Sequence, residues 1–267
     1  MKFAFSTLGC PDWLWEEIIT VAADMGFDGV ELRGIGSEIY LPHVKNFALE
    51  KIPALRERLS QLNLEIPCLT TGAFLFDRNE KEKAKQEVTD YVLLAAALGT
   101  PYVRVLGDRN PEPGSVDESL VEENLRELLP LADENNVTLL LETNGVYAES
   151  MKLARLLEKI NHPHLACLWD VHHPYRYFGE PVQETYTNLK PWIRHLHVKD
   201  SIVKEGKIYY RMFGYGDIPL ANVIRCLSMD DYQGYVVLEW VKRWCMDLEE
   251  PGIVFTHYLN AVKNMLP

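Results

Sequence analysis

The chain has 267 residues, of which 47% are hydrophobic and 25% are charged, values typical of an ordinary soluble globular protein. Its formal net charge of −12, from 27 basic and 39 acidic residues, disfavours a nucleic-acid partner and an anionic membrane surface, because both are bound through clustered Lys and Arg. Five scattered cysteines without a CxxC pair, and no apolar run near the ~20 residues of a membrane span, favour a reduced, cytoplasmic protein.

Short β-rich runs alternate with amphipathic stretches along the chain. The predicted strands are 2–8, 28–33, 65–70, 102–107, 137–142, 165–170, 193–199 and 235–240. Each is followed by a predicted helix; in the same order these are 13–25, 48–62, 79–98, 117–136, 149–161, 181–190, 218–230 and 253–265. The helical period is clearest at 117–136, where Leu120, Leu125, Leu128 and Leu129 share one face. Gly26 stands where the first of these helices is expected to end.

Eight strand–helix units of roughly 33 residues each match the repeat step of a parallel α/β barrel. No Ser-, Gly- or Pro-rich stretch marks an interdomain linker, so one domain over residues 1–267 is expected. An open doubly wound sheet would usually carry a Gly-rich phosphate turn after its first strand, but STLGCPDW contains one Gly and no GxGxxG. The sequence therefore predicts the α/β class and a single (β/α)8 TIM barrel.

The last four predicted strands each end in a side chain that binds metals: Glu142, Asp170, His197 and Glu239. Singly, such residues are more often solvated strand ends, helix caps or core histidines, but four on successive strands indicate one site. Neighbouring strands lie about 4.8 Å apart, and barrel enzymes act at the carboxyl ends of their strands. Three carboxylates and one imidazole suit Mn²⁺ first, with Mg²⁺ or Co²⁺ as alternatives; Zn²⁺ is disfavoured because it prefers more nitrogen or sulfur ligands.

Period-two alternation predicts which side chains enter the barrel. His195, His197 and Lys199 share one face of the seventh strand, and this polar face is expected to point inward. Arg104 and Glu31 are also expected to project inward. A buried ion pair that supports the interior is as consistent with these two residues as a role in substrate binding.

Motifs at these strand ends resemble those of the xylose isomerase-like TIM barrel superfamily. In order they are LLLETNG, WDVHHP with its D-x-x-H spacing from Asp170 to His173, HLHVKD and LEW. GFDGVELR and FGYGDIPL (213–220) are also similar, so the resemblance covers essentially the whole chain. The superfamily holds sugar and sugar-phosphate isomerases and epimerases, inosose dehydratases and the endonuclease IV enzymes. The last group is disfavoured because it needs further His and carboxylate ligands for three zinc ions and a basic DNA face.

Similarity to the ketose 3-epimerase branch implies a role for each matched residue. Glu142, Asp170, His197 and Glu239 are implied to bind the divalent metal, and Glu142 and Glu239 also to act as acid and base on opposite substrate faces. His173 is implied to contact a sugar oxygen near the carbonyl. The implied protein is a divalent-metal-dependent isomerase or epimerase of a small sugar or sugar derivative, with proton transfer α to a carbonyl through a metal-stabilised enediolate. A homodimer or homotetramer is the assembly expected from such relatives.

Two other function classes stay open beside this one. A lyase on the same scaffold, similar to an inosose dehydratase, would remove water or a glycosyl leaving group β to a carbonyl. A non-catalytic ligand-binding barrel is the second alternative. It is disfavoured because all four predicted ligands and His173 are present.

The chain departs from the epimerase branch at two positions. That branch has an Arg where Val203 stands here, and Arg211 is the candidate that replaces it in substrate binding by a different loop path. Lys199 stands where the branch has a small residue and adds a cation beside the metal. Lys199 is expected either to bind substrate or to form a salt bridge with Asp200 or Glu142.

The loop after the seventh strand raises the question of a phosphorylated substrate. Gly214 and Gly216 precede a helix start at Asp217, at a place where barrels often bind phosphate. An Asp at the start of the helix would repel a phosphate. A plain tight turn is therefore the alternative for this segment.

Overall fold

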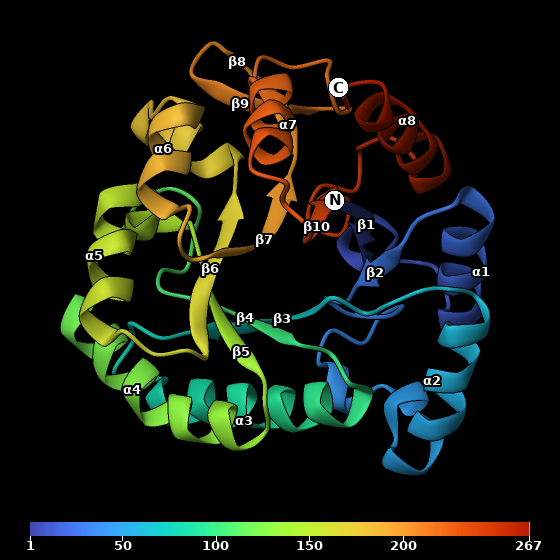
Figure 1. The fold of residues 1–267 in the computed structure, drawn as a ribbon, viewed down its shortest axis with the longest axis horizontal. Coiled ribbons are helices and arrows are strands. Elements are labelled where there is room, and N and C mark those ends of the chain that lie inside the picture. The colour runs from blue at the N-terminus through green and yellow to red at the C-terminus, as the bar shows by residue number, and fades with distance from the viewer. Residues whose placement is uncertain (267) are drawn as a thin grey trace.

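The computed structural model describes residues 1–266 and shows a ring of helices around a barrel of parallel strands (Figure 1). The barrel strands are β1 (Lys2–Ser6), β2 (Gly29–Glu31), β3 (Cys68–Phe74), β4 (Tyr102–Leu106), β5 (Thr138–Glu142), β6 (Leu165–Asp170), β7 (Ile193–Val198) and β10 (Tyr235–Leu238). Their hydrogen-bonded order is β2-β1-β10-β7-β6-β5-β4-β3. Bridges between Gly29 and Glu65 and between Leu32 and Leu69 join the β2 and β3 sides. The predicted (β/α)8 barrel is confirmed.

The helices cover the outside of the barrel, as Figure 1 shows. They are α1 (Trp15–Met25), α2 (Ile52–Gln61), α3 (Lys81–Leu98), α4 (Glu118–Glu134), α5 (Ser150–Ile160), α6 (Val182–Leu189), α7 (Leu220–Met229) and α8 (Pro251–Lys263). The α4 helix begins where Asp117 accepts a hydrogen bond from the Leu120 N–H, and it buries the predicted apolar face. The α1 helix ends at Gly26, which has the left-handed φ of 81° that closes many helices.

Two segments differ from the sequence-based expectation. After β7 the chain forms an antiparallel hairpin of β8 (Asp200–Lys204) and β9 (Lys207–Arg211), where a plain loop was expected. The hairpin turns at Glu205 and Gly206, both with positive φ. The strand predicted at 65–70 is shifted and runs from Cys68 to Phe74. Pro67 lacks the N–H that a ladder needs, which explains the later start.

Side chains of the strands form two apolar layers. Those that point outward, such as Leu139, Leu141 and Trp169, belong to the main core beneath the helices. Those that point inward form small separate clusters inside the barrel, one of which includes Leu140 and Leu168. Among residues 1–266, no helix is both long and apolar enough to cross a bilayer.

Short helical turns connect these elements. They are 3-10 turns at Thr7–Gly9, Leu41–His43, Lys45–Phe47, Leu49–Lys51 and Gly145–Ala148, and a π-helical turn at Pro174–Phe178. The last of these begins at Pro174, the final residue of the WDVHHP motif.

Candidate active site

The four predicted metal ligands meet at the carboxyl end of the barrel. Glu142 and Asp170 end β5 and β6, His197 lies in β7 opposite Asp170, and Glu239 directly follows β10. All four side chains are buried. Donor atoms of Glu142, Asp170 and His197 lie within 4.8 Å of one another, and Glu239 Oε1 is 3.3 Å from His197 Nδ1. Side chains that are up to 97 positions apart in sequence thus form one cluster.

The His197 ring shows that this cluster fits a divalent metal. Its Nε2 lies 2.8 Å from Glu31 Oε2. Its Nδ1 is fully buried, has no hydrogen-bond partner among the described residues, and faces Glu142 Oε1 at 3.9 Å and Glu239 Oε1 at 3.3 Å. A histidine whose second nitrogen is held by a carboxylate is the usual arrangement of a metal ligand. The donor set therefore suits a hard divalent cation.

Glu31 is a residue whose role the sequence reasoning missed. It was expected to point inward, with Arg104 as a candidate partner, but its Oε2 instead accepts from both His195 Nε2 and His197 Nε2 at 2.8 Å. Arg104 lies beside Glu142, with Nε 3.2 Å from Oε2. The only signal in the sequence was the inward parity of Glu31 within GVELR, which does not identify a partner.

Lys199 forms buried ion pairs, with partners that differ from those expected. Its Nζ contacts Asp170 Oδ2 and Glu239 Oε2, so the expected salt bridge to Asp200 or Glu142 is wrong. The side chain of Asp200, the next residue, points to the opposite side and accepts hydrogen bonds from the backbone N–H groups of the following loop. Burial lowers the pKa of Lys199, but the charges of Asp170 and Glu239 outweigh it and raise this pKa well above its usual value. The ammonium therefore stays charged among the carboxylates.

The two candidate acid–base residues have opposite proton affinities. Burial raises the pKa of Glu142 to about 7, with Arg104 and His197 opposing the shift and the Glu239 and Asp170 charges adding to it. Burial also raises the pKa of Glu239, but the Lys199 and His197 charges outweigh it and the net shift is downward. At neutral pH one carboxyl group can hold a proton while the other is ionised. Paired groups of this kind commonly divide acid and base roles.

His173 lies where the D-x-x-H spacing predicts, beside Glu142 and Asp170. Its Nδ1–H donates to the Thr143 carbonyl at 2.9 Å, which leaves Nε2 3.5 Å from Asp170 Oδ2. Burial, followed by the Lys199 charge, holds the pKa of His173 well below its usual value, so the ring is neutral. His172 turns away and lies 2.9 Å from Ser201 Oγ. Only the second histidine of the motif faces the site.

Arg211 does not lie with the other candidate substrate-binding residues. It sits on the β8–β9 hairpin, where its Nη1 donates to the Tyr210 carbonyl and its guanidinium lies 6.0 Å from the Tyr209 ring centre. It does not line the cavity, whereas its neighbour Tyr210 does. The following loop is a plain turn: the Gly214 and Gly216 N–H groups both donate to Asp200 at 2.9 Å and are not free to bind a phosphate.

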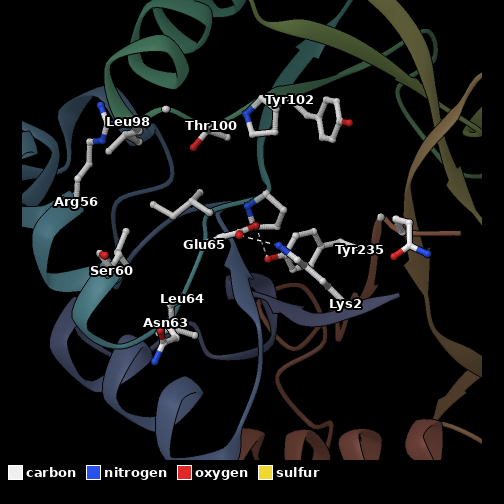
Figure 2. Close-up of a pocket in the computed structure, with 17 residues that line it drawn as sticks. Lys2, Arg56, Ser60, Asn63, Leu64, Glu65, Leu98, Thr100, Tyr102 and Tyr235 are labelled. Carbon is white, nitrogen blue, oxygen red and sulfur yellow. Dashed lines mark hydrogen bonds and ion pairs between the residues drawn. The ribbon is translucent and has the colours of Figure 1, made fainter.

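Two cavities lie at opposite ends of the barrel. One of about 410 Å³ is lined by Glu142, His173, Lys199 and Glu239. The other, of about 600 Å³, lies where the strands begin; Figure 2 shows the Lys2–Glu65–Tyr235 network at its centre, with Lys2 Nζ 2.6 Å from Glu65 Oε1. Barrel enzymes act at the carboxyl ends of their strands. The smaller cavity is therefore the candidate active site.

Comparison with known proteins agrees with this geometry. The chain is 25% identical over 278 aligned positions to fructoselysine 3-epimerase of Escherichia coli O157:H7, an alignment that covers 100% of this chain and 99% of the relative. It superposes on the IolI protein with a bound zinc atom (TM-score 0.80, 16% identity, 99% and 98% of the two chains) and on the probable 3-DHS dehydratase AsbF of Bacillus anthracis (TM-score 0.79, 19% identity, 99% of each). These two structures share the fold.

The family comparison covers most of the chain. Residues 19–254 match the family described as xylose isomerase-like TIM barrel. This match includes the four clustered residues, their Glu31 and Lys199 partners and His173. The chain therefore belongs to the xylose isomerase-like TIM barrel family.

Proposed function

We propose that this enzyme is a divalent-metal-dependent epimerase or isomerase of a small sugar or sugar derivative. The observation that carries the proposal is the pair Glu142 and Glu239, whose Oε1 atoms lie 3.9 Å and 3.3 Å from His197 Nδ1 and which both line the active-site cavity. The relative from Escherichia coli is a fructoselysine 3-epimerase, which supports a proton transfer beside a sugar carbonyl. An epimerase needs one group that removes this proton and another that returns it.

Glu239 is the proposed base and Glu142 the proposed acid. Glu239 is ionised because Lys199 and His197 hold its pKa down, so it can remove a proton from the carbon beside the carbonyl. Glu142, whose pKa burial raises to about 7 in the metal-free protein, is the group that would deliver a proton from the other side to the resulting enediolate. The neutral His173 ring and the Lys199 ammonium face the same cavity and orient substrate oxygens there. The reverse reaction exchanges the two carboxyl roles.

Glu142, Asp170, His197 and Glu239 would hold the metal in this proposal. When bound, a divalent cation supplies Lewis-acid stabilisation of negative charge on substrate oxygens. Three carboxylates and one imidazole favour Mn²⁺, with Mg²⁺ or Co²⁺ as alternatives. Zinc, which the IolI structure contains, is less suited to so many oxygen donors.

A lyase of the dehydratase kind is the second candidate. The same base would remove the proton, and a protonated Glu142 could then protonate a leaving hydroxyl β to the carbonyl. In the metal-free protein the pKa of Glu142 is about 7, so part of this carboxyl group is protonated at neutral pH, as the acid for such a leaving group must be.

Uptake of deuterium from solvent separates these functions. Protein supplied with Mn²⁺ is incubated in D₂O with a panel of ketoses and inososes, and the carbon-bound deuterium is measured by NMR. Exchange with retention of all hydroxyls supports the epimerase or isomerase, loss of water supports the lyase, and no exchange with any compound contradicts both.

Two variants test the assigned acid and base. Glu239→Gln is expected to abolish exchange because it removes the base. Glu142→Gln is expected to abolish formation of the epimer because it removes the group that returns the proton. The matched control is Glu65→Gln, which changes a carboxylate at the opposite end of the barrel and should keep both activities. Exchange that survives in Glu239→Gln, or epimer formation that survives in Glu142→Gln, would contradict the mechanism.

A further inference from the structure

The active-site cavity has a positive lining in a strongly acidic protein. Its charged lining residues are four cations, Arg33, Arg104, Arg109 and Lys199, and two carboxylates, Glu142 and Glu239. The chain as a whole carries a net charge of −12. The excess of cations is therefore a property of this cavity and not of the composition. A cleft lined by one sign of charge attracts ligands of the other sign.

Three of the four cations already have a carboxylate partner. Lys199 contacts Asp170 and Glu239, and Arg104 Nε lies 3.2 Å from Glu142 Oε2. At the exposed rim, Arg109 Nη2 lies 3.4 Å from Asp77 Oδ2. Arg33 differs: within residues 1–266, no carboxylate oxygen lies within the 4.0 Å of an ion pair with its guanidinium.

The backbone and its neighbours hold the Arg33 side chain against the cavity. The Arg33 N–H donates to Thr7 Oγ1 at 2.9 Å, and Nη1 donates to the Ile39 carbonyl at 3.4 Å. Gly72 leaves room for the guanidinium, since a Cβ there would lie 2.9 Å from Arg33 Nη2. Glu87 lies nearby, but its Oε1 accepts the Gly72 N–H at 2.5 Å. The remaining guanidinium donors of Arg33 have no protein partner in the described chain.

Arg33 also lies across the barrel from the metal cluster. It follows β2, next to β3, whereas the clustered residues come from β5, β6, β7 and β10. Burial, with the charge of Arg104 as the next cause, lowers the pKa of Arg33. A partly buried guanidinium beside a like charge is unfavourable in the free protein, and a bound anion would offset this.

We propose that Arg33 binds an anionic group, a carboxylate or a phosphate, at the end of the substrate remote from the metal cluster. This inference rests on the proposed sugar-converting function and narrows its substrate class to acidic sugar derivatives. A guanidinium presents two parallel N–H donors, which match the paired oxygens of either group. Arg33 lines the cavity together with Thr71, Gly72 and Phe74, and none of these three neighbours is an acid.

A matched series of ketoses tests the inference. D-Fructose, D-fructuronate and D-fructose 6-phosphate share one ketone and differ in the group at C6. Their dissociation constants are measured by calorimetry on the Mn²⁺-loaded protein. At least one of the two acids is expected to bind about tenfold or more tighter than D-fructose, because hydrogen bonds to charged groups are the stronger ones. The acid that binds more tightly than D-fructose identifies the natural group as a carboxylate or a phosphate.

Variants assign the effect to Arg33. Arg33→Met is expected to remove the preference for the acid over D-fructose, and Arg33→Lys to restore part of it. Arg56→Met, at the cavity of the opposite end, is the matched control and should keep the preference. Equal affinity of wild-type protein for all three sugars, failure of both acids to bind, or a preference that survives Arg33→Met would each overturn the inference.

Binding and turnover are read separately in these experiments. A protein that exchanges no deuterium but shows the Arg33-dependent preference would contradict the proposed function and keep the anion site. An active enzyme that binds D-fructose as tightly as both acids would keep the proposed function and contradict the anion site.

Discussion

Glu31 Oε2 lies 2.8 Å from His197 Nε2, on the opposite side of the ring from the clustered carboxylates. Burial alone would raise the pKa of Glu31, but His197 and His195 outweigh it, so this pKa lies well below its usual value. A permanently ionised acceptor keeps the proton of His197 on Nε2. Nδ1 is therefore the nitrogen that gives up its proton when a metal binds, and it faces the site where Glu142 and Glu239 converge.

Glu31→Gln should weaken Mn²⁺ binding about 10- to 100-fold, the usual effect of losing an outer partner of a metal-bound histidine. The amide can donate to His197 Nε2 and so favours the wrong tautomer. Calorimetric titration with Mn²⁺ measures the change, and circular dichroism checks the fold. Glu65→Gln, which changes a carboxylate at the other end of the barrel, is the control. Unchanged Mn²⁺ affinity in a folded Glu31→Gln protein would contradict the assigned role.

Mn²⁺ affinity should rise with pH. Burial lowers the pKa of His197, but the charges of Glu31 and Glu239 raise it to about 9, and the pKa of Glu142 is about 7. Below these values a proton competes with the cation for each donor, so binding at pH 7 releases about one to two protons. Calorimetric titrations with Mn²⁺ at pH 7, in buffers of different ionisation enthalpy, measure the number of protons released. A heat of binding that is independent of the buffer would contradict the prediction.

Lys199→Met should destabilise the metal-free protein by about 3–5 kcal/mol, because it leaves the buried Asp170 and Glu239 carboxylates without their cation. Added Mn²⁺ supplies positive charge at the same carboxylates, so it should stabilise the variant more than the wild type. Urea unfolding with chelator and then with Mn²⁺ measures both effects. Lys81→Met, which removes the surface ion pairs to Glu123 and Glu127, is the control and should change little. An equal loss of unfolding free energy in Lys199→Met and in the Lys81→Met control would contradict the prediction.

The convergence of the four candidate metal ligands was predictable because each of them is marked locally in the sequence. Glu142, Asp170 and Glu239 each close an apolar run, and alternation places His197 on the inner face of its strand. Strand parity and the rule that barrel chemistry lies at the carboxyl ends then bring them together. This part of the site could be predicted without knowing which distant residues pair with one another.

Sequence periodicity could not predict which of the inward-pointing side chains pair with one another. Glu31 and His197 are 166 positions apart, and parity shows only that both point inward. Lys199 had several carboxylates within reach, and the selection of Asp170 and Glu239 depends on packing in three dimensions. The β8–β9 hairpin is a different case, since the Glu205–Gly206 turn between β-rich runs is visible in the sequence. Its polar residues were instead read as a substrate loop.

Asp200 organises the loop that follows this hairpin. Its carboxylate accepts the N–H groups of Ser201 at 2.8 Å, of Gly214 and Gly216 at 2.9 Å, and of Ile218 at 3.2 Å. Asp200→Asn replaces one acceptor oxygen with a donor that faces these N–H groups. A loss of about 1–3 kcal/mol in the free energy of unfolding is expected, since buried donors are left unpaired.

Hydrogen–deuterium exchange tests where this loss occurs. Amides of residues 213–218 should exchange faster in Asp200→Asn, whereas the exposed control Asp231→Asn should leave them unchanged. Inorganic phosphate should not slow exchange of these amides in the wild type, because Asp200 already occupies them. Protection of this loop by phosphate would instead show that the glycine turn binds anions, and would move the expected anion site away from Arg33.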